Sequence, residues 1–236
     1  MTGRANGARP DIHRGGTIGI PCHELARYTD FYAALAGTDM PPDTKIVWAK
    51  GTSVAENCNI CVKQMEGDWL WILGDDHVWH PDALRQLLFR NLDVVVPHGL
   101  RRKPPYLHVA YETFNKDEGL LYEELPRTGL VPVEATGTAG MLVRKNVLDA
   151  IEEPWFAMAG ELANEDIYFC WKIRQAGFDI FMDMDVKFGH IVQSAVWPVW
   201  DKEADKWTAG LDLGEGRGIT LAPPEKEEQH AERNLA

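Results

Sequence analysis

Two adjacent aspartates and a histidine follow a short apolar run near residue 70. The segment 72–84 has the sequence ILGDDHVWHPDAL, in which Asp75, Asp76 and His77 come directly after the apolar residues WLWIL. Carboxylates at the end of a buried strand repel one another and lose hydration unless a cation lies between them. Aspartate oxygens suit Mg²⁺ or Mn²⁺, and an added imidazole moves the preference toward Mn²⁺. The segment favours a divalent metal site over the alternative, a helix N-terminus that merely carries acidic residues.

A second carboxylate pair and a late histidine occur further along the chain. Glu165 and Asp166 fall in the first turn of a predicted helix that Asn164 can cap. Acidic residues are common in that turn, so the pair alone needs no functional explanation. His190, in KFGHIV, follows a predicted strand, and a single histidine is more often structural than a ligand. The three features together indicate one site.

The elements that must position these residues alternate between strand and helix in the first half of the chain. Short apolar runs predict strands at 17–21, 45–50, 69–73 and 92–97, with helices after the second and third. This alternation predicts an α/β fold with a mostly parallel, Rossmann-like central sheet flanked by helices. Ligands bind at the carboxyl ends of such strands, where Pro21, Asp75 and Asp76 lie. Short strand-like pieces between 106 and 135 predict a smaller mixed sheet.

The chain divides into three parts. Its 236 residues suffice for one large domain. Residues 1–16 are polar and glycine-rich and are expected to form a disordered arm. Residues 17–209 are expected to form a single domain, and 210–236, rich in glycine, proline and charge, a polar tail.

Composition and charge exclude several classes of protein. The net charge is −12 and the pI about 5.1, so the surface repels phosphate backbones and an extended nucleic-acid interface is not expected. The dense basic cluster is RRK at 101–103. The N-terminus has no apolar signal-peptide core and no apolar run reaches membrane-spanning length. These features predict a soluble, cytoplasmic protein.

The cysteines are expected to be reduced. Cys58 and Cys61 form a CxxC, but no second CxxC exists to complete a zinc site. Both are expected to be small buried residues on one face of a helix.

The ordered set of motifs resembles the GT-A fold glycosyltransferases, in particular the large family that includes cellulose and chitin synthases. TIGIPCHE is similar to the first strand and nucleotide-binding loop, and WLWILGDDHVWHPDALRQLL to the "DxD" strand and the helix after it. GTAGMLVRKNVLDAI is similar to the donor-sugar and acceptor loop, NEDIYFCWKIRQAGF to the "ED" motif, and FGHI to the segment with the late metal-binding histidine. The resemblance covers about residues 17–191. It implies a small single-domain enzyme of the hexosyltransferase type, such as occurs in bacteria and bacteriophages, acting in the host cytoplasm if phage-encoded.

The metal motif departs from the family pattern. Aligned on Pro81, the second aspartate of DxD falls on Asp76 and the first on Gly74. Asp75 and His77 alternatively form a DxH, as in polypeptide N-acetylgalactosaminyltransferases. The resemblance implies Asp76 and His190 as ligands of Mn²⁺ or Mg²⁺, with His77 as a further candidate.

The resemblance also implies roles for the other residues. Asp166 is expected to deprotonate an acceptor hydroxyl, with inversion at the anomeric carbon, and Glu165 to orient it or touch the acceptor. The donor is expected to be a nucleoside diphosphate-sugar, with UDP as the nucleotide. The acceptor stays open between glycan, protein and modified base. The residues expected to contact the donor are Pro21, Cys22, His23, Ser53, Asn57, Asp75 and Gly140.

A tryptophan-rich segment, VWPVWDKEADKW at 196–207, follows the last motif. Sugar rings stack on aromatic surfaces, so Trp197 and Trp200 are candidates for an acceptor contact or lid. An equally good interpretation is that these tryptophans pack a C-terminal element over the sheet. A non-catalytic sugar-binding protein and a degenerate GT-A protein also stay open, the second because of Gly74.

Overall fold

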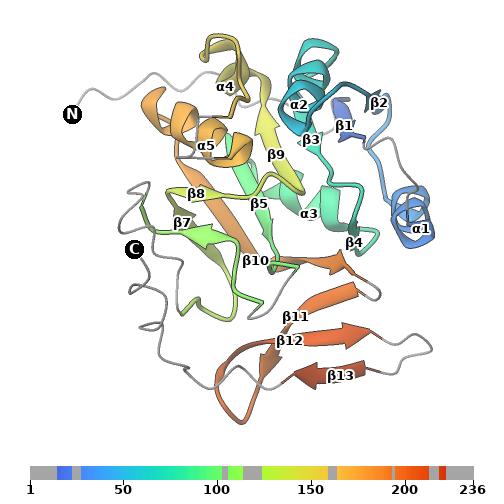
Figure 1. The fold of residues 1–236 in the computed structure, drawn as a ribbon, viewed down its shortest axis with the longest axis vertical. Coiled ribbons are helices and arrows are strands. Elements are labelled where there is room, and N and C mark those ends of the chain that lie inside the picture. The colour runs from blue at the N-terminus through green and yellow to red at the C-terminus, as the bar shows by residue number, and fades with distance from the viewer. Residues whose placement is uncertain are drawn as a thin grey trace, which may run out of the picture.

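One mixed sheet forms the centre of the molecule in the computed structural model (Figure 1). The structure describes residues 15–22, 28–102, 106–113, 124–158, 164–192, 195–212 and 218–221. The sheet runs in the order β2-β1-β3-β9-β5-β10. Its strands are β1 (Thr17–Pro21), β2 (Lys45–Ala49), β3 (Trp69–Ile72), β5 (Val94–His98), β9 (Met141–Arg144) and β10 (Ile180–Ile191).

The strand directions confirm the expected GT-A α/β architecture. β1 pairs in parallel with β2 and β3, and β5 pairs in parallel with β10. β9 lies between β3 and β5 and is antiparallel to both. Its direction follows from the chain path, because the turn at 137–140 lies at the carboxyl ends of the other strands and β9 runs back from it. The sequence predicted this turn and strand, but not the place of β9 in the middle of the sheet.

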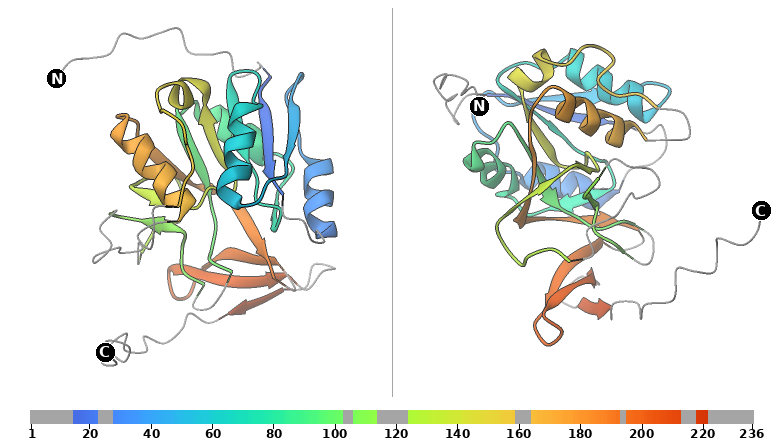
Figure 2. Two further views of the ribbon diagram at one scale, coloured as in Figure 1. Left: turned by 45° about the horizontal axis from the view of Figure 1, so that its top comes forward. Right: turned by 90° about the vertical axis from the view of Figure 1, so that its left-hand side faces the viewer.

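Helices cover both faces of the sheet, as the right-hand view of Figure 2 shows. α2 (Val54–Lys63), α4 (Lys145–Asp149) and α5 (Glu165–Gln175) cover one face, and α1 (Thr29–Gly37) and α3 (Ala83–Arg90) the other. Each face has its own apolar cluster. In β3 and the residue after it, Leu70 and Ile72 face the first cluster, whereas Trp69, Trp71 and Leu73 face the second. This period of two explains why WLWIL is apolar throughout, since both sides of the strand are covered.

α2 begins at a serine N-cap. The hydroxyl of Ser53 accepts a hydrogen bond of 3.1 Å from the backbone N–H of Glu56. The Glu56 carboxylate turns back to the N–H of Thr52, one residue earlier than in a standard capping box. Cys58 and Cys61 are buried on the inner face of this helix, and the four cysteines are free thiols.

Four short strands bear on the site. β4 (His77–Trp79) pairs antiparallel with the end of β10. β6 (Ala110–Tyr111) and β8 (Ala135–Thr136) form a separate two-stranded sheet, and β7 (Leu130–Val133) adds antiparallel to β10. β6, β7 and β8 form the smaller part that the sequence predicted from the strand-like pieces between 106 and 135.

The C-terminal strands extend further than expected. β11 (Ala195–Asp201), β12 (Lys206–Asp212) and β13 (Gly218–Leu221) continue the sheet beyond β10 by antiparallel pairing. Strand structure therefore continues past residue 209, where the sequence predicted a polar tail. The segment LDLGEGRGITL is glycine-rich overall, but its two short apolar runs suffice for antiparallel pairing at a sheet edge. Within the described residues no helix is long and apolar enough to cross a membrane.

Candidate active site

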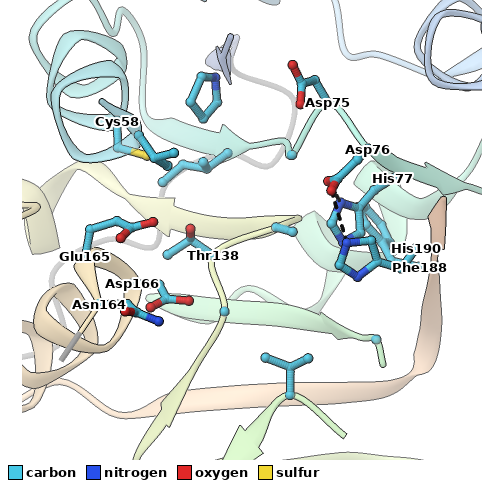
Figure 3. A pocket seen from close by; sticks show the side chains of 18 of the residues that line it. Cys58, Asp75, Asp76, His77, Thr138, Asn164, Glu165, Asp166, Phe188 and His190 are labelled. Carbon is cyan, nitrogen blue, oxygen red and sulfur yellow. Dashed lines mark hydrogen bonds and ion pairs between the residues drawn. The ribbon is translucent and has the colours of Figure 1, made fainter. Parts of the chain in front are cut away.

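A cavity of about 1690 Å³ opens at the carboxyl ends of the central strands (Figure 3). Pro21 at the end of β1, Gly74 after β3 and Pro97 near the end of β5 all line it. The loop before α2 and the N-terminus of α5 close its other sides. The cavity thus lies at the sheet edge where the strand alternation predicted a ligand site.

Asp76, His77 and His190 converge on one wall of this cavity. His77 and His190 are directly opposite each other in the β4–β10 ladder, and their ring centroids are 4.1 Å apart. Nε2 of His190 lies 3.1 Å from Oδ2 of Asp76, and Nδ1 of His77 lies 2.8 Å from Oδ1. One ligand atom from each of the three residues lies within 4.8 Å of the others. The structure thus brings together the three residues that the sequence singled out for a metal.

The hydrogen bonds of the two histidines fit a cation in this cluster. The carbonyl of Leu100 is 3.1 Å from Nδ1 of His190, so this nitrogen carries the hydrogen and donates it. Nε2 of His190 then faces the Asp76 carboxylate, which is the orientation of a metal-binding histidine fixed by an outer carbonyl. Nδ1 of His77 is buried and makes no hydrogen bond. A divalent cation between the three side chains would give this nitrogen the partner that it lacks.

The pKa shifts of Asp76 and His77 also fit a cation in this cluster. Burial opposes ionisation of Asp76, but its contacts with His190 and His77 outweigh burial and hold the pKa of Asp76 well below its usual range. Burial lowers the pKa of His77, which keeps the imidazole neutral and able to bind a metal. One carboxylate and two imidazoles form a donor set that Mn²⁺ accepts more readily than Mg²⁺.

The structure explains the glycine in the metal motif. A Cβ atom at Gly74 would lie 2.8 Å from Nδ1 of His77 and 3.2 Å from Oδ1 of Asp76. His77 therefore occupies the space into which a side chain at 74 would project. Asp75 lines the cavity but points away from the cluster (Figure 3).

Glu165 and Asp166 lie across the cavity from the cluster, with Thr138 between (Figure 3). They begin α5, whose capping residue Asn164 has an extended backbone and makes no side-chain cap. Oδ1 of Asp166 accepts a hydrogen bond of 2.8 Å from the N–H of Ile167. Burial, with a smaller contribution from the charge of Glu165, raises the pKa of Asp166 to about 6. A carboxyl with such a pKa is ionised at neutral pH and is a stronger base than an ordinary aspartate.

The expected donor-binding residues divide into two groups. Pro21, Cys22, Ser53 and Asn57 line the cavity. The Asn57 amide is already engaged, since it donates to the Cys22 carbonyl over 2.9 Å and accepts from the N–H of Gly51. These two hydrogen bonds tie the residue after β1 to the loop before α2, and Asn57 itself is only 5% exposed. His23 lies outside the described residues.

Gly140 does not line the cavity, although Thr138 and Ala139 do. Its backbone has a φ of +81°, and a Cβ atom there would lie 2.5 Å from Pro97. Its carbonyl accepts a hydrogen bond of 2.9 Å from Nε1 of Trp71. The glycine is thus needed for a tight turn that fixes its cavity-lining neighbours.

Neither Trp197 nor Trp200 is among the residues that line the cavity. Trp197 packs against the second apolar cluster, with its ring 5.5 Å from that of His80. Trp200 meets Trp207 edge-on at 5.4 Å. The β11–β12 hairpin adds to the sheet and does not fold over the cavity as a lid (Figure 1). The packing alternative is the one that the structure supports.

Two arginines in the cavity wall were not predicted as site residues. Arg101 donates to the hydroxyl of Tyr111 over 2.8 Å, and Nη1 of Arg102 lies 3.1 Å from Oδ2 of Asp76. The sequence shows them as a basic cluster only. Their position just after the fourth predicted strand was the available signal, because Asp75 follows the third strand in the same way.

Comparisons with known proteins identify the family. The profile described as "Glycosyltransferase like family 2" matches residues 34–211. Among solved structures, A197 from STIV is similar, with a TM-score of 0.54 and 16% identity over 81% of this chain and 91% of that one. The structure of GalNAc-T7 with UDP, GalNAc and Mn²⁺ has a TM-score of 0.43 and 12% identity, over 63% of this chain and 32% of that one. No curated protein matches. The profile match covers most of the chain, which therefore belongs to glycosyltransferase-like family 2 and has the GT-A fold.

Proposed function

We propose that the protein transfers a hexosyl group from a nucleoside diphosphate-sugar, with UDP as the nucleotide, to an acceptor hydroxyl with inversion. The observation that carries the proposal is the placement of two chemically different groups on opposite walls of one cavity. Asp76, His77 and His190 form a cation-binding wall, and the buried Asp166 carboxyl forms a basic one. A donor diphosphate requires the first group and an acceptor hydroxyl the second.

Asp76, His77 and His190 would hold Mn²⁺ or Mg²⁺. The metal would supply positive charge to neutralise the diphosphate as the bond to the sugar breaks. The chain fixes these three side chains through the β4–β10 pairing, and Leu100 sets the tautomer of His190. This preorganisation lets the ligands act without reorientation.

Asp166 would accept the proton of the acceptor hydroxyl. Its raised pKa improves proton transfer, and Ile167 holds Oδ1 in place, which leaves Oδ2 for the acceptor. Oδ2 faces the turn at Gly137, where an added Cβ atom would be 3.7 Å away. Direct attack by a hydroxyl activated at this wall, opposite the diphosphate, inverts the anomeric carbon. Glu165 adds negative charge beside the base and so helps to raise its pKa.

The nucleotide would lie toward β1 and α2. Pro21, Cys22 and Ser53 line that part of the cavity, and Asp75 points away from the metal cluster and is placed for a ribose contact. His23, Asn57 and Gly140 complete the proposed set, with Asn57 and Gly140 acting on the loops around the nucleotide. The acceptor is a glycan, a protein or a modified base.

Thermal unfolding with nucleotides tests the proposal. The melting temperature is measured with UDP, GDP, CDP and ADP, each with and without Mn²⁺, since a ligand of the native state alone raises it. We expect a metal-dependent rise with UDP in the wild type and its loss in Asp76→Asn. Lys145→Ala, at the opposite end of the sheet, serves as the control. Absence of any nucleotide effect in the wild type would sink the proposal and favour a degenerate protein.

Stereochemistry tests the second half. Proton NMR of the first product formed from an α-linked UDP-sugar should show a β-linked sugar. An α-linked product would exclude direct displacement with Asp166 as the base. Nucleotide binding without transfer or hydrolysis of any donor would instead favour a non-catalytic sugar-nucleotide-binding protein.

A further inference from the structure

Arg102 contacts the carboxylate oxygen that also faces His190. Nη1 of Arg102 and Nε2 of His190 are each 3.1 Å from Oδ2 of Asp76. The side chains of Asp76 and His190 are 23% and 17% exposed, whereas that of Arg102 is 48% exposed. The guanidinium therefore reaches the cluster from the solvent side of the cavity, and its charge supplies what a cation would otherwise supply to Asp76.

A divalent cation bound by Asp76, His77 and His190 would lie close to this guanidinium, because both need the same carboxylate. Like charges at such short range repel each other strongly in a partly buried site. Arg102 and a metal ion therefore compete for Asp76.

The guanidinium of Arg102 is also able to move away from Asp76. The two residues before it are held in place, since the N–H of Arg101 donates to the carbonyl of Leu107 over 2.9 Å and Leu100 forms a β-bridge with His108. Among the residues that the structure describes, Asp76 is the ion-pair partner of Arg102. One ion pair on a half-exposed side chain is a weak restraint. The guanidinium can thus turn into the cavity while its backbone stays in place.

We propose that Arg102 couples the binding of the metal to the binding of the nucleoside diphosphate, an inference that rests on the proposed function. In the empty site the guanidinium neutralises Asp76 and opposes the metal. With the metal on Asp76, the guanidinium turns to the diphosphate oxygens, whose spacing suits the two N–H groups of an arginine fork. Arg102 thereby weakens metal binding without nucleotide and strengthens nucleotide binding with metal.

The experiment measures the two affinities separately. Free Mn²⁺ is counted by its electron paramagnetic resonance signal in the absence of nucleotide, and UDP, GDP, CDP and ADP are titrated calorimetrically at saturating Mn²⁺. The variants are Arg102→Ala, Arg102→Lys and the control Arg85→Ala, whose guanidinium pairs with Asp39 and does not line the cavity. Melting temperatures without ligand show that each variant folds.

The two affinities should change in opposite directions in Arg102→Ala. We expect Mn²⁺ to bind about tenfold more tightly and the diphosphate about tenfold more weakly, a coupling of ordinary size. Arg102→Lys, which keeps the charge without the fork, should lie between the alanine variant and the wild type. Arg85→Ala should stay within about twofold of the wild type for both ligands.

Other outcomes would overturn either the coupling alone or the proposed function as well. A wild type that binds Mn²⁺ and a diphosphate, with Arg102→Ala unchanged in either affinity, overturns the coupling and leaves the proposed function intact. A loss of both affinities in Arg102→Ala also overturns it, because it shows that Arg102 supports the site rather than opposing the metal. A wild type that binds neither ligand overturns the proposed function, and the coupling with it.

Discussion

His77 and His190 form a directly opposed pair in the antiparallel β4–β10 ladder, with ring centroids 4.1 Å apart. The pairing places both rings against Asp76, whose carbonyl accepts a hydrogen bond of 2.7 Å from the N–H of Ile191. A backbone ladder thus holds all three side chains, so the geometry of the proposed metal site is built into the sheet.

Gly74→Ala should damage the proposed metal site without unfolding the protein. The new Cβ atom would lie 2.8 Å from Nδ1 of His77, so the imidazole must move away. We expect Mn²⁺ affinity to fall by about tenfold, as is usual when a ligand loses its position. Gly74→Asp, which restores a DxD, should weaken Mn²⁺ binding too, because its side chain needs the same space.

The matched control for this change is Gly99→Ala. Gly99 lines the same cavity, but a Cβ atom there would meet nothing closer than 3.8 Å. Its Mn²⁺ affinity should equal that of the wild type. Tighter Mn²⁺ binding in Gly74→Asp would show that a carboxylate at 74 serves better than His77 and would contradict this account of the motif.

The sequence predicted where candidate site residues lie in their strands and helices better than it predicted which side chains they contact. Asp76 and Asp166 could be assigned because the carboxyl end of a strand and the first turn of a helix are local features. The His77–His190 pair depends on β4, a strand of three residues whose register no local pattern specifies. Arg102 was visible only as part of a basic cluster, because its ion pair with Asp76 joins two distant loops.

Two expectations concern side chains whose packing the sequence does not show. Asn57 lines the cavity, as expected of a donor contact, and its amide also holds two backbone segments together. Trp197 and Trp200 were weighed as a lid, and the hairpin that carries them continues the sheet. A polar or aromatic side chain near a site has the same sequence signature whether it meets a ligand or the protein, and long-range packing decides between the two.

Asn57→Ala should destabilise the fold by about 2 kcal/mol, because it removes the hydrogen bonds of the buried Asn57 amide to the Cys22 carbonyl and the Gly51 N–H. Urea unfolding monitored by circular dichroism measures this loss. Asn146→Ala is the control, since Asn146 is an exposed helical asparagine whose amide donates to Asp93, and it should cost less than about 0.5 kcal/mol. Equal effects of the two variants would show that the Asn57 bridge does not hold the loops.

Trp200→Ala should lower stability and leave substrate binding unchanged. Trp200 packs edge-on against Trp207, and Arg127 lies 5.7 Å from the centre of its ring. Truncation of this half-buried ring should cost about 2 kcal/mol. Trp48→Ala, whose side chain is 45% exposed on edge strand β2, is the comparison and should cost little. An increase in acceptor KM for Trp200→Ala without loss of stability would restore the lid hypothesis.

Asp166→Asn should stabilise the protein at pH 8 and not at pH 4. Burial raises the folded-state pKa from 3.8 to about 6, so folding favours the neutral form of this carboxyl. The cost of burying the charge is therefore absent below pH 3.8 and fully present above pH 6. Asparagine removes that cost, which we place at about 2 kcal/mol after allowing for residual solvent contact. Urea unfolding of both proteins at pH 4, 6 and 8 measures the difference, which should grow with pH.

The same substitution should nearly abolish turnover. Loss of a positioned base lowers kcat by about 10²- to 10⁴-fold, while binding of UDP with Mn²⁺, which involves the opposite wall, should not change. In the wild type, kcat/KM should fall as pH drops through about 6, because Asp166 then takes up a proton. A variant that is both more stable and active would show that the buried charge has another purpose. A variant that is more stable and inactive would show that the protein retains a destabilising buried charge because the reaction needs it.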